Sequence, residues 1–359
     1  MLAKVLDDTD SYLGYPVPAA VRRRLLRECW EACEPDPERQ PDMQAYLDSH
    51  PSRCRPFLND GGIHISIRTY SELIALAKEA LGARPRQDVM VMSAAQPSSR
   101  GDRPLDDQAG DTALALCVAL LLMMDIGSHQ YSISGSTVLR WDPDETLRHA
   151  VNRHFRSQRG VLRSENSRLG KLFTTRNLDL VGGLNIKWTH NLVDHLRLAD
   201  DDKTVFIFHS VGFLKFHQTF GQGVFPKGFV EETLRTLALL FPENDSKSRK
   251  WTASQIETKQ DQQLDPGLAK CGTLRAHERR LEQFSFWHDR LVILKQTFDE
   301  SSPRTLTQWW NDRRNSVQWY TFWVAIMVFV FTLFFGFVQS VEGGLQVWLA
   351  WEARSPDAE

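Results

Sequence analysis

The feature that most constrains this 359-residue chain is a stretch of 27 residues, 315–341, without any Asp, Glu, Lys or Arg. Its central part, residues 319–341, contains six Phe and is apolar on every face of a helix. A helix needs about 20 apolar residues to cross the roughly 30 Å hydrocarbon core of a membrane. A buried helix of a soluble protein is normally shorter and carries a polar stripe. The sequence therefore predicts one transmembrane helix over residues 319–341.

Aromatic residues flank this segment on both sides. Trp319, Tyr320 and Trp323 stand at its start, and Trp348 and Trp351 follow its end. Indole and phenol rings favour the headgroup region, because one edge is apolar and the other can form hydrogen bonds. This placement agrees with a helix that spans a bilayer.

The charges around the segment predict its orientation. Arg304, Arg313 and Arg314 precede it, whereas the tail, residues 342–359, carries four acidic residues and one Arg. Because cytosolic flanks carry an excess of Lys and Arg, we expect the N-terminal part in the cytosol and the C-terminus in a lumen or outside the cell. The N-terminal residues lack a signal-peptide pattern, so a tail-anchored topology is predicted. The glycosylation sequon Asn244-Asp245-Ser246 should then stay unmodified.

The remaining composition is typical of a globular protein, with 42% hydrophobic and 25% charged residues. A net charge of -2 argues against the strongly basic surface that nucleic-acid binding requires. Five cysteines are too few, and odd in number, for a disulfide scaffold. The expected partners are the lipid bilayer and an unidentified cytosolic protein, with no nucleic acid.

Helix patterns outnumber strand patterns, which predicts a mainly α fold with a small β element (α+β), ending in a long helix that continues into the transmembrane helix. Helices are expected at 18–33, from Thr69 or Ser71 to Leu81, at 112–124, near 143–156, at 191–198 and at 229–241. Strands are expected at 63–67, 88–92, within 178–188 and at 204–209.

The predicted organisation has six parts. They are an N-terminal helical region with short strands and a loop (1–110), the main cytosolic core (111–242), a polar linker (243–270), a helical stalk (271–318), the transmembrane helix (319–341) and a short acidic tail (342–359). Residues 273–299 are expected to form one long helix that packs back on the core. Its partial heptad also suggests a homo-oligomer through a coiled coil, the alternative arrangement.

Residues 204–213 are the most enzyme-like segment. A strand followed by Ser210 and Gly212 resembles the nucleophile elbow of α/β-hydrolases. However, Phe208 occupies the position that needs a small residue for the sharp turn. The plainer interpretation is that Ser210 caps the helix that follows.

Histidines cluster between residues 190 and 217. On a helix, His190 and Asp194 would share a face and could hold a metal together, with His209 and His217 downstream. His195 would lie on a diverging face. Because no further ligand completes the set, partly buried histidines with satisfied hydrogen bonds explain the pattern better.

The cysteines offer one further pair, Cys29 and Cys33, which could bind a metal or respond to redox state. Without a second pair, both are more simply apolar positions of one helix, and Cys117 belongs to the core. Standard phosphate-binding glycine motifs are absent from the sequence. We assign no catalytic residue, cofactor or metal from the sequence.

The second half of the chain resembles a known family. The segments that carry the resemblance are FSFWHDRLVILKQTFDE (284–300), QWWNDRRNSVQWYTFWVA (308–325), FFGFVQSVEGGLQVW (334–348), and the stretches 183–209 and 225–242. They are similar to uncharacterised single-span membrane proteins of filamentous ascomycete fungi. The resemblance implies membrane residence and a fungal origin, and the family carries no established activity.

Two functional hypotheses follow. The first is a tail-anchored membrane protein whose cytosolic domain acts as an interaction or adaptor module. The second is a membrane-attached enzyme or accessory factor of a fungal small-molecule pathway, with Ser210 or the histidine cluster at its site. The second hypothesis predicts a concave pocket that brings those groups together.

Overall fold

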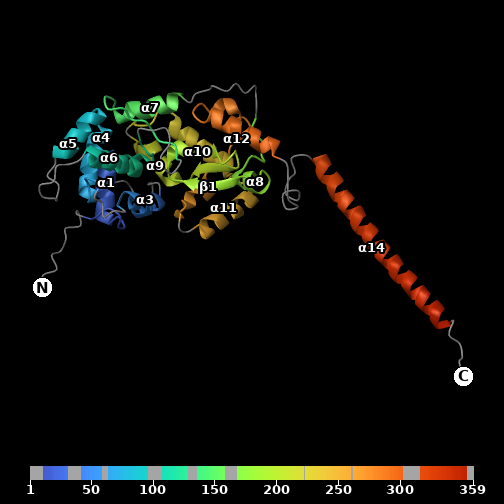
Figure 1. The fold of residues 1–359 in the computed structure, drawn as a ribbon. Helices are drawn as coiled ribbons and strands as arrows, with labels where there is room; N and C mark the ends of the chain where they lie inside the picture. The colour runs from blue at the N-terminus through green and yellow to red at the C-terminus, as the bar shows by residue number, and fades with distance from the viewer. Residues whose placement is uncertain are drawn as a thin grey trace, which may run out of the picture. The chain divides into compact units, whose positions relative to one another are not determined.

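The computed structural model describes residues 11–30, 42–58, 64–95, 107–127, 136–157, 168–221, 223–259, 262–301 and 316–353. The chain divides into two compact units, Met1–Ser301 and Ser302–Glu359. The first unit contains helices and a small sheet, and the second contains one long helix (Figure 1). This is the predicted mainly α fold with a small β element.

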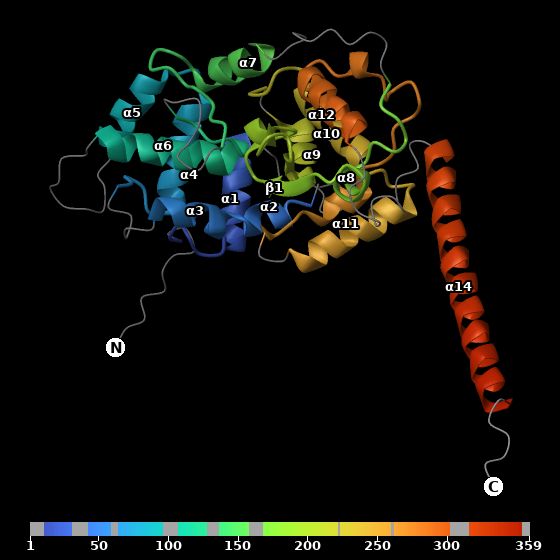
Figure 2. The ribbon, with the colours of Figure 1, turned by 45° about the vertical axis from the view of Figure 1, so that its right-hand side comes forward.

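The helices of the first unit lie on both sides of the sheet region. Helices α1, α4, α5 and α6 gather at one end of the unit, and α8, α10, α11 and α12 gather at the other, with strand β1 between them (Figures 1 and 2). The bounds of the elements are α1 Ala19–Trp30, α2 Gln44–Asp48, α3 His50–Leu58, α4 Tyr70–Leu81, α5 Arg86–Ala95, α6 Asp107–Leu122, α7 Leu147–Ser157, α8 Thr175–Leu180, β1 Asn185–Thr189, η1 Leu192–Asp194, β2 Leu198–Ala199, β3 Thr204–Phe208, α9 Val211–Phe220, α10 Phe229–Leu240, α11 Ser246–Thr258, η3 Pro266–Lys270, η4 Leu281–Gln283 and α12 His288–Glu300.

The sheet has three strands in the order β1-β3-β2. β1 and β3 run parallel, with Asn185 opposite Thr204 and Thr189 opposite Phe208. β2 pairs with β3 in the antiparallel sense. β3 is therefore the central strand, and its side chains are buried except for the partly exposed Phe206. Burial on both faces explains why this strand is a continuous apolar run rather than an alternating one.

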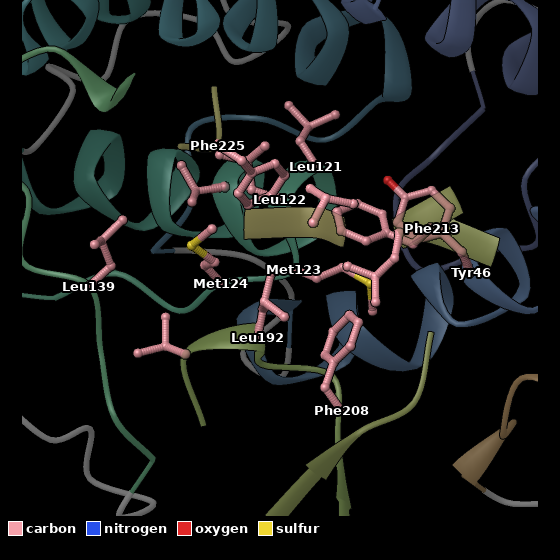
Figure 3. Close-up of a cluster of buried hydrophobic side chains, with 14 of the residues drawn as sticks. Tyr46, Leu121, Leu122, Met123, Met124, Leu139, Leu192, Phe208, Phe213 and Phe225 are labelled. Atoms are coloured by element: carbon pink, nitrogen blue, oxygen red, sulfur yellow. The ribbon is translucent and has the colours of Figure 1, made fainter. Parts of the chain in front are cut away.

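The end of α6 lies in the hydrophobic core. Residues 121–124 pack with Leu192, Phe208 and Phe213 in one cluster (Figure 3). Met123 has a φ of 52°, which ends the helix, and its carbonyl accepts a hydrogen bond from the Leu192 N–H at 2.7 Å. This bond holds the end of α6 beside the segment that follows β1.

Several predicted elements are confirmed. α4 begins with the expected Thr69 cap, in which the Thr69 hydroxyl accepts from the Glu72 N–H and the Glu72 carboxylate accepts from the Thr69 N–H. The predicted helices at 18–33, 112–124, 143–156 and 229–241 correspond to α1, α6, α7 and α10. The predicted strand at 204–209 corresponds to β3.

Two predicted strands are wrong. Within 63–67, the described residues form no strand, although Ile65 and Ile67 are buried as the alternation suggested. Residues 88–92 belong to helix α5, where Val89 faces the core and Val91 is exposed. Short apolar runs fit a strand or a turn of helix equally well, so their packing partners decide between the two.

The predicted polar linker, residues 243–270, is also wrong, because it contains helix α11 and the 3-10 turn η3. The Asp245 carboxylate accepts from the N–H groups of Lys247 and Ser248 and thereby caps α11. Its buried face is formed by the small side chains of Ser248 and Thr252. Such residues carry little apolar surface, so hydropathy does not show that the helix is packed.

The predicted long helix over 273–299 is half right. Residues 273–287 are turns and the short η4, and the helix α12 begins only at His288. The segment packs back on the core as expected. The four apolar heptad positions are buried inside the unit, which leaves none of them for a coiled coil; they are Leu281, Phe284, Leu291 and Phe298.

A buried carboxylate fixes the turn before α12. Glu232 on α10 is 5% exposed and accepts hydrogen bonds from three successive backbone N–H groups, those of residues 285–287, at 2.7 to 2.9 Å. Burial raises the pKa of Glu232, and the three N–H groups act in the opposite direction. One side chain thus ties the segment that follows η4 to the centre of the unit.

Glu232→Ala should lower the free energy of unfolding by about 3 kcal/mol or more, because three buried N–H groups lose their acceptor. Glu231→Ala is the matched control, since the neighbouring Glu231 is exposed on the same helix and should change stability by less than about 0.5 kcal/mol. The measurement is denaturant unfolding of the full-length protein in detergent, followed by tryptophan fluorescence. Equal effects of the two variants would contradict this role.

The second unit contains helix α14, Ser316–Ala353. Its part Trp319–Glu352 has a mean hydropathy of 2.4 in its most apolar window, none of which is buried inside the protein. The helix is therefore long and apolar enough to cross a membrane, as predicted. Residues 342–353, expected as part of a short tail, continue the helix. Arg304, Arg313 and Arg314 lie outside the described residues.

Candidate ligand-binding cavity at the strand ends

A cavity of about 730 Å³ lies at the carboxyl ends of β1 and β3. It is lined from β1 by Trp188 and Thr189, and from β3 by Phe206. Helix α3 contributes Arg53, and the residues after α6 contribute Asp125. Crevices at the carboxyl ends of parallel strands are common ligand sites, because strand and loop residues converge there.

The parallel register places two histidines side by side at this edge. Thr189 pairs with Phe208, so the next residues, His190 and His209, are neighbours, and their ring centroids are 4.6 Å apart in an edge-to-face arrangement. Both rings line the cavity. The His209 Nδ1 accepts the Asp265 N–H at 3.4 Å.

Burial keeps both imidazoles neutral. It lowers the pKa of His190 to about 2, with repulsion from His209 and Arg53 adding to the effect. It lowers the pKa of His209 to about 3, again with a contribution from Arg53. A histidine with so low a pKa offers one N–H donor and one nitrogen acceptor at neutral pH.

The predicted helix 191–198 is a short 3-10 turn, η1, followed by β2. The Asn191 side chain caps η1 by accepting the Val193 N–H at 3.1 Å. His190 therefore lies before the turn, and it does not share a helix face with Asp194. The two residues nevertheless line the same cavity.

Asp194 is almost fully buried and its oxygens are occupied by protein groups. Its Oδ1 accepts from the Thr137 N–H at 2.9 Å and from Arg197 Nε at 2.6 Å, and its Oδ2 accepts from the Asn191 amide at 3.1 Å. The Arg197 guanidinium in turn lies 4.4 Å from the centre of the Phe206 ring. This network neutralises Asp194 and positions one wall of the cavity.

Asp125 is the second acid at the cavity. Burial raises its pKa, while the positive charge of Arg53 and a hydrogen bond from Ser136 oppose that rise. The Ser136 hydroxyl lies 3.2 Å from Asp125 Oδ2. The Asp125 N–H also donates to the Asn191 side chain at 3.3 Å. Asp125 therefore connects the end of α6 to the same polar network as Asp194.

A metal centre finds little support in this geometry. Within the described residues, no group of three or more His, Cys, Asp or Glu side chains is placed to hold a metal ion. His190 and His209 form a pair of neighbours, whereas structural zinc sites use four ligands and catalytic sites at least three protein ligands.

Ser210 does not occupy the position of a nucleophile. It lies at the N-cap of α9, buried, and does not line the cavity. The described residues show no hydrogen bond between its hydroxyl and a histidine, nor the side-chain cap that the sequence suggested. The turn instead depends on Gly212, whose N–H donates to Asp265 at 2.7 Å.

His195 and His217 lie away from the cavity. The His195 Nδ1 accepts the Phe208 N–H at 3.2 Å and its Nε2 contacts the Thr236 hydroxyl at 2.7 Å, so His195 joins β3 to α10. His217 is buried among aromatic rings, including Trp30 and Phe213. Burial lowers the pKa of each to about 3. The hydrogen bonds of His195 agree with the plainer interpretation, whereas the two ring nitrogens of the buried His217 have no partner among the described residues.

Three of the four described cysteines are buried, namely Cys29, Cys54 and Cys117, and Cys271 is half-buried. Burial raises the pKa of Cys29 to about 12, and Cys117 is also buried with a raised pKa. Both belong to the core, and the described cysteines form no disulfide. Cys33 lies outside the described residues.

Sequence reasoning missed Arg53 and Asp125. Asp125 follows the apolar run 112–124 and is a visible charge at a helix end. Arg53 stands in a segment, HPSRCRPFL, without any motif that marks it. Only folding brings these residues to the histidines.

Comparison with known proteins finds no matching family model, no matching curated protein and no matching solved structure. The resemblance to fungal single-span membrane proteins therefore stays a prediction.

Gly212→Ala should destabilise the first unit by more than about 3 kcal/mol, as overpacking of a tight site does. A Cβ at this position would lie 1.9 Å from the Asp42 carbonyl oxygen, so the backbone must move. Gly110→Ala is the control, since a Cβ there meets its nearest neighbour, Met90, at 4.0 Å inside helix α6. It should leave stability unchanged or raise it by up to about 1 kcal/mol. Thermal unfolding of both full-length variants checks this, and an unchanged melting temperature for Gly212→Ala would contradict it.

Proposed function

We propose that this protein is a tail-anchored, single-span membrane protein whose first unit faces the cytosol and binds a small-molecule ligand. The observation that carries the membrane part of the proposal is α14, whose apolar side chains are exposed in the structure. Leaving one Phe side chain in water costs about 1.5–3 kcal/mol relative to burial, so the six Phe of residues 319–341 together cost on the order of 10 kcal/mol. Insertion into a bilayer removes this cost.

The charges next to the span support the cytosolic placement of the first unit. Three Arg precede the apolar segment, at positions 304, 313 and 314, and acidic residues prevail after it. The positive-inside bias therefore retains the N-terminal side in the cytosol.

The cavity at the strand ends favours ligand binding over a role as a protein adaptor. Its volume, about 730 Å³, falls in the range of about 300–1,000 Å³ typical of small-molecule sites. The histidines of the predicted cluster that line it, His190 and His209, come from separate strands and converge there. The cavity favours the second sequence hypothesis, a membrane-attached enzyme or accessory factor of a small-molecule pathway, as far as ligand binding is concerned and without Ser210 as a nucleophile.

The anchor is tested by extraction of the full-length protein from membranes with alkaline carbonate. The full chain should stay in the membrane pellet, because a spanning helix resists this treatment. A variant that ends at Ser301, and so lacks α14, should appear in the supernatant. Release of the full-length protein by carbonate would contradict the anchor.

Glycosylation of the membrane-bound protein tests the orientation of the helix. Asn244 and Ser246 of the natural sequon are exposed, at the start of α11, so a lumenal first unit would present them to the glycosylation machinery. We expect no glycan at Asn244 and a glycan on an acceptor tag appended after Glu359. The reverse pattern would contradict the cytosolic placement.

A further inference from the structure

Three buried polar atoms of the cavity lining lack a hydrogen-bond partner within the described part of the chain. They are Nη1 of Arg53, Nε1 of Trp188 and Nδ1 of His190. Buried polar groups in native proteins are nearly always paired with protein, water or a ligand. The Arg and Trp atoms can only donate, and the His atom can donate in one tautomer. Each atom belongs to a side chain that lines the cavity, so an acceptor on a bound ligand would give it the partner that it lacks.

Arg53 is the cation available to a ligand. Among the described residues, no carboxylate lies within 4.0 Å of its guanidinium, whereas the neighbouring cation Arg197 is engaged by Asp194 at 2.6 Å. The planar guanidinium presents parallel N–H groups whose spacing matches the two oxygens of a carboxylate. A carboxylate is therefore a fitting acceptor for this position.

The acids around the cavity limit the charge of the ligand. Asp194 is neutralised by Arg197, but Asp125 has no ion pair in the described part of the protein and acts electrostatically on Arg53. The cavity thus balances one cation with one nearby anion. Asp125 repels every negative charge on a ligand, and Arg53 can offset one of them, so a second charge would add repulsion without a second available cation among the described lining residues.

The rest of the cavity suits an apolar body. Its walls include aromatic and aliphatic side chains, namely Phe57, Ala115, Ala119, Ile126, Val138 and Phe206. Ligand sites commonly combine such walls with a few placed polar groups that fix orientation.

We propose that the cavity binds a small organic monocarboxylate, with its carboxylate on Arg53, Trp188 and His190 and its apolar body against the walls around Phe206. This inference rests on the proposed ligand-binding role and names the class of ligand. It is independent of the anchor, because binding is measurable on the full-length protein in detergent.

The test uses three probes that share a naphthalene ring and differ in their polar group: 2-naphthoate, its neutral amide 2-naphthamide, and 2-naphthyl phosphate. Isothermal titration calorimetry of the full-length protein in detergent micelles measures each dissociation constant, with protein-free micelles as the blank. We expect saturable binding of 2-naphthoate, with binding of the amide and of the phosphate weaker by tenfold or more.

Variants on one helix locate the site. Arg53→Gln should weaken 2-naphthoate binding by tenfold or more, whereas Arg55→Gln, two residues along α3 and exposed, should bind like the wild type. Trp188→Phe keeps an aromatic side chain, although a smaller one, and removes the indole N–H, so it should weaken binding several-fold. Near-UV circular dichroism verifies that each variant is folded.

Four results would overturn the proposal: no saturable binding of 2-naphthoate, equal binding of the amide, tighter binding of the phosphate, or unchanged affinity in a folded Arg53→Gln. If Arg53→Gln does not fold, two other measurements test the proposal. They are the affinities of the wild type for the carboxylate, amide and phosphate probes, and the affinity of Trp188→Phe for 2-naphthoate. Tighter binding of the phosphate would leave the proposed ligand-binding role standing and reject only the monocarboxylate class.

Discussion

The parallel pairing of β1 with β3 is the contact on which the arrangement of the first unit depends. Each strand has five residues, and their register sets Thr189 opposite Phe208. The side chains of β1 alternate, with Ile186 and Trp188 packed against the core and Asn185 and Lys187 exposed, so a slip by one residue would turn the apolar pair away from the core. The same register sets His190 beside His209 at the carboxyl edge. The cavity exists because the chain leaves both strands at that edge.

The charged and polar groups at this edge of the sheet then determine which ligands the cavity can bind. Burial keeps the two imidazoles neutral, so they contribute dipoles and hydrogen-bonding groups rather than charge. The Asp194 carboxylate accepts hydrogen bonds from Arg197, from the Thr137 N–H and from the Asn191 amide, which makes it part of the wall. Arg53, with Asp125 nearby, is the charged side chain that is left to interact with a ligand. The apolar helix α14 belongs to the second unit and is long and apolar enough to cross a membrane.

The elements that could be predicted from the sequence are those marked by a run or a regular spacing of apolar side chains. Helix α14, helix α6 and strand β3 all carry that signal. Helix α11 carries no such signal, because its buried residues are Ser248 and Thr252. Residues 273–287 have the apolar spacing of a helix, but they form turns that bury the same side chains. For the site, the neighbourhood of His190 and Asp194 was predicted, but through a helix that does not form. Arg53 depends on packing between distant segments, which no local pattern encodes.

The most direct test of the account is nuclear magnetic resonance of the imidazole rings in the full-length protein, labelled with ¹³C-histidine and kept in detergent. His190→Gln and His209→Gln assign the two sets of signals by their disappearance. The account predicts a nuclear Overhauser effect between the two rings, and shifts that do not titrate between pH 8 and pH 5, because both pKa values lie at about 3 or below. Two rings without that cross-peak, each titrating near pH 6.5 as an exposed histidine does, would contradict the register, and with it the cavity.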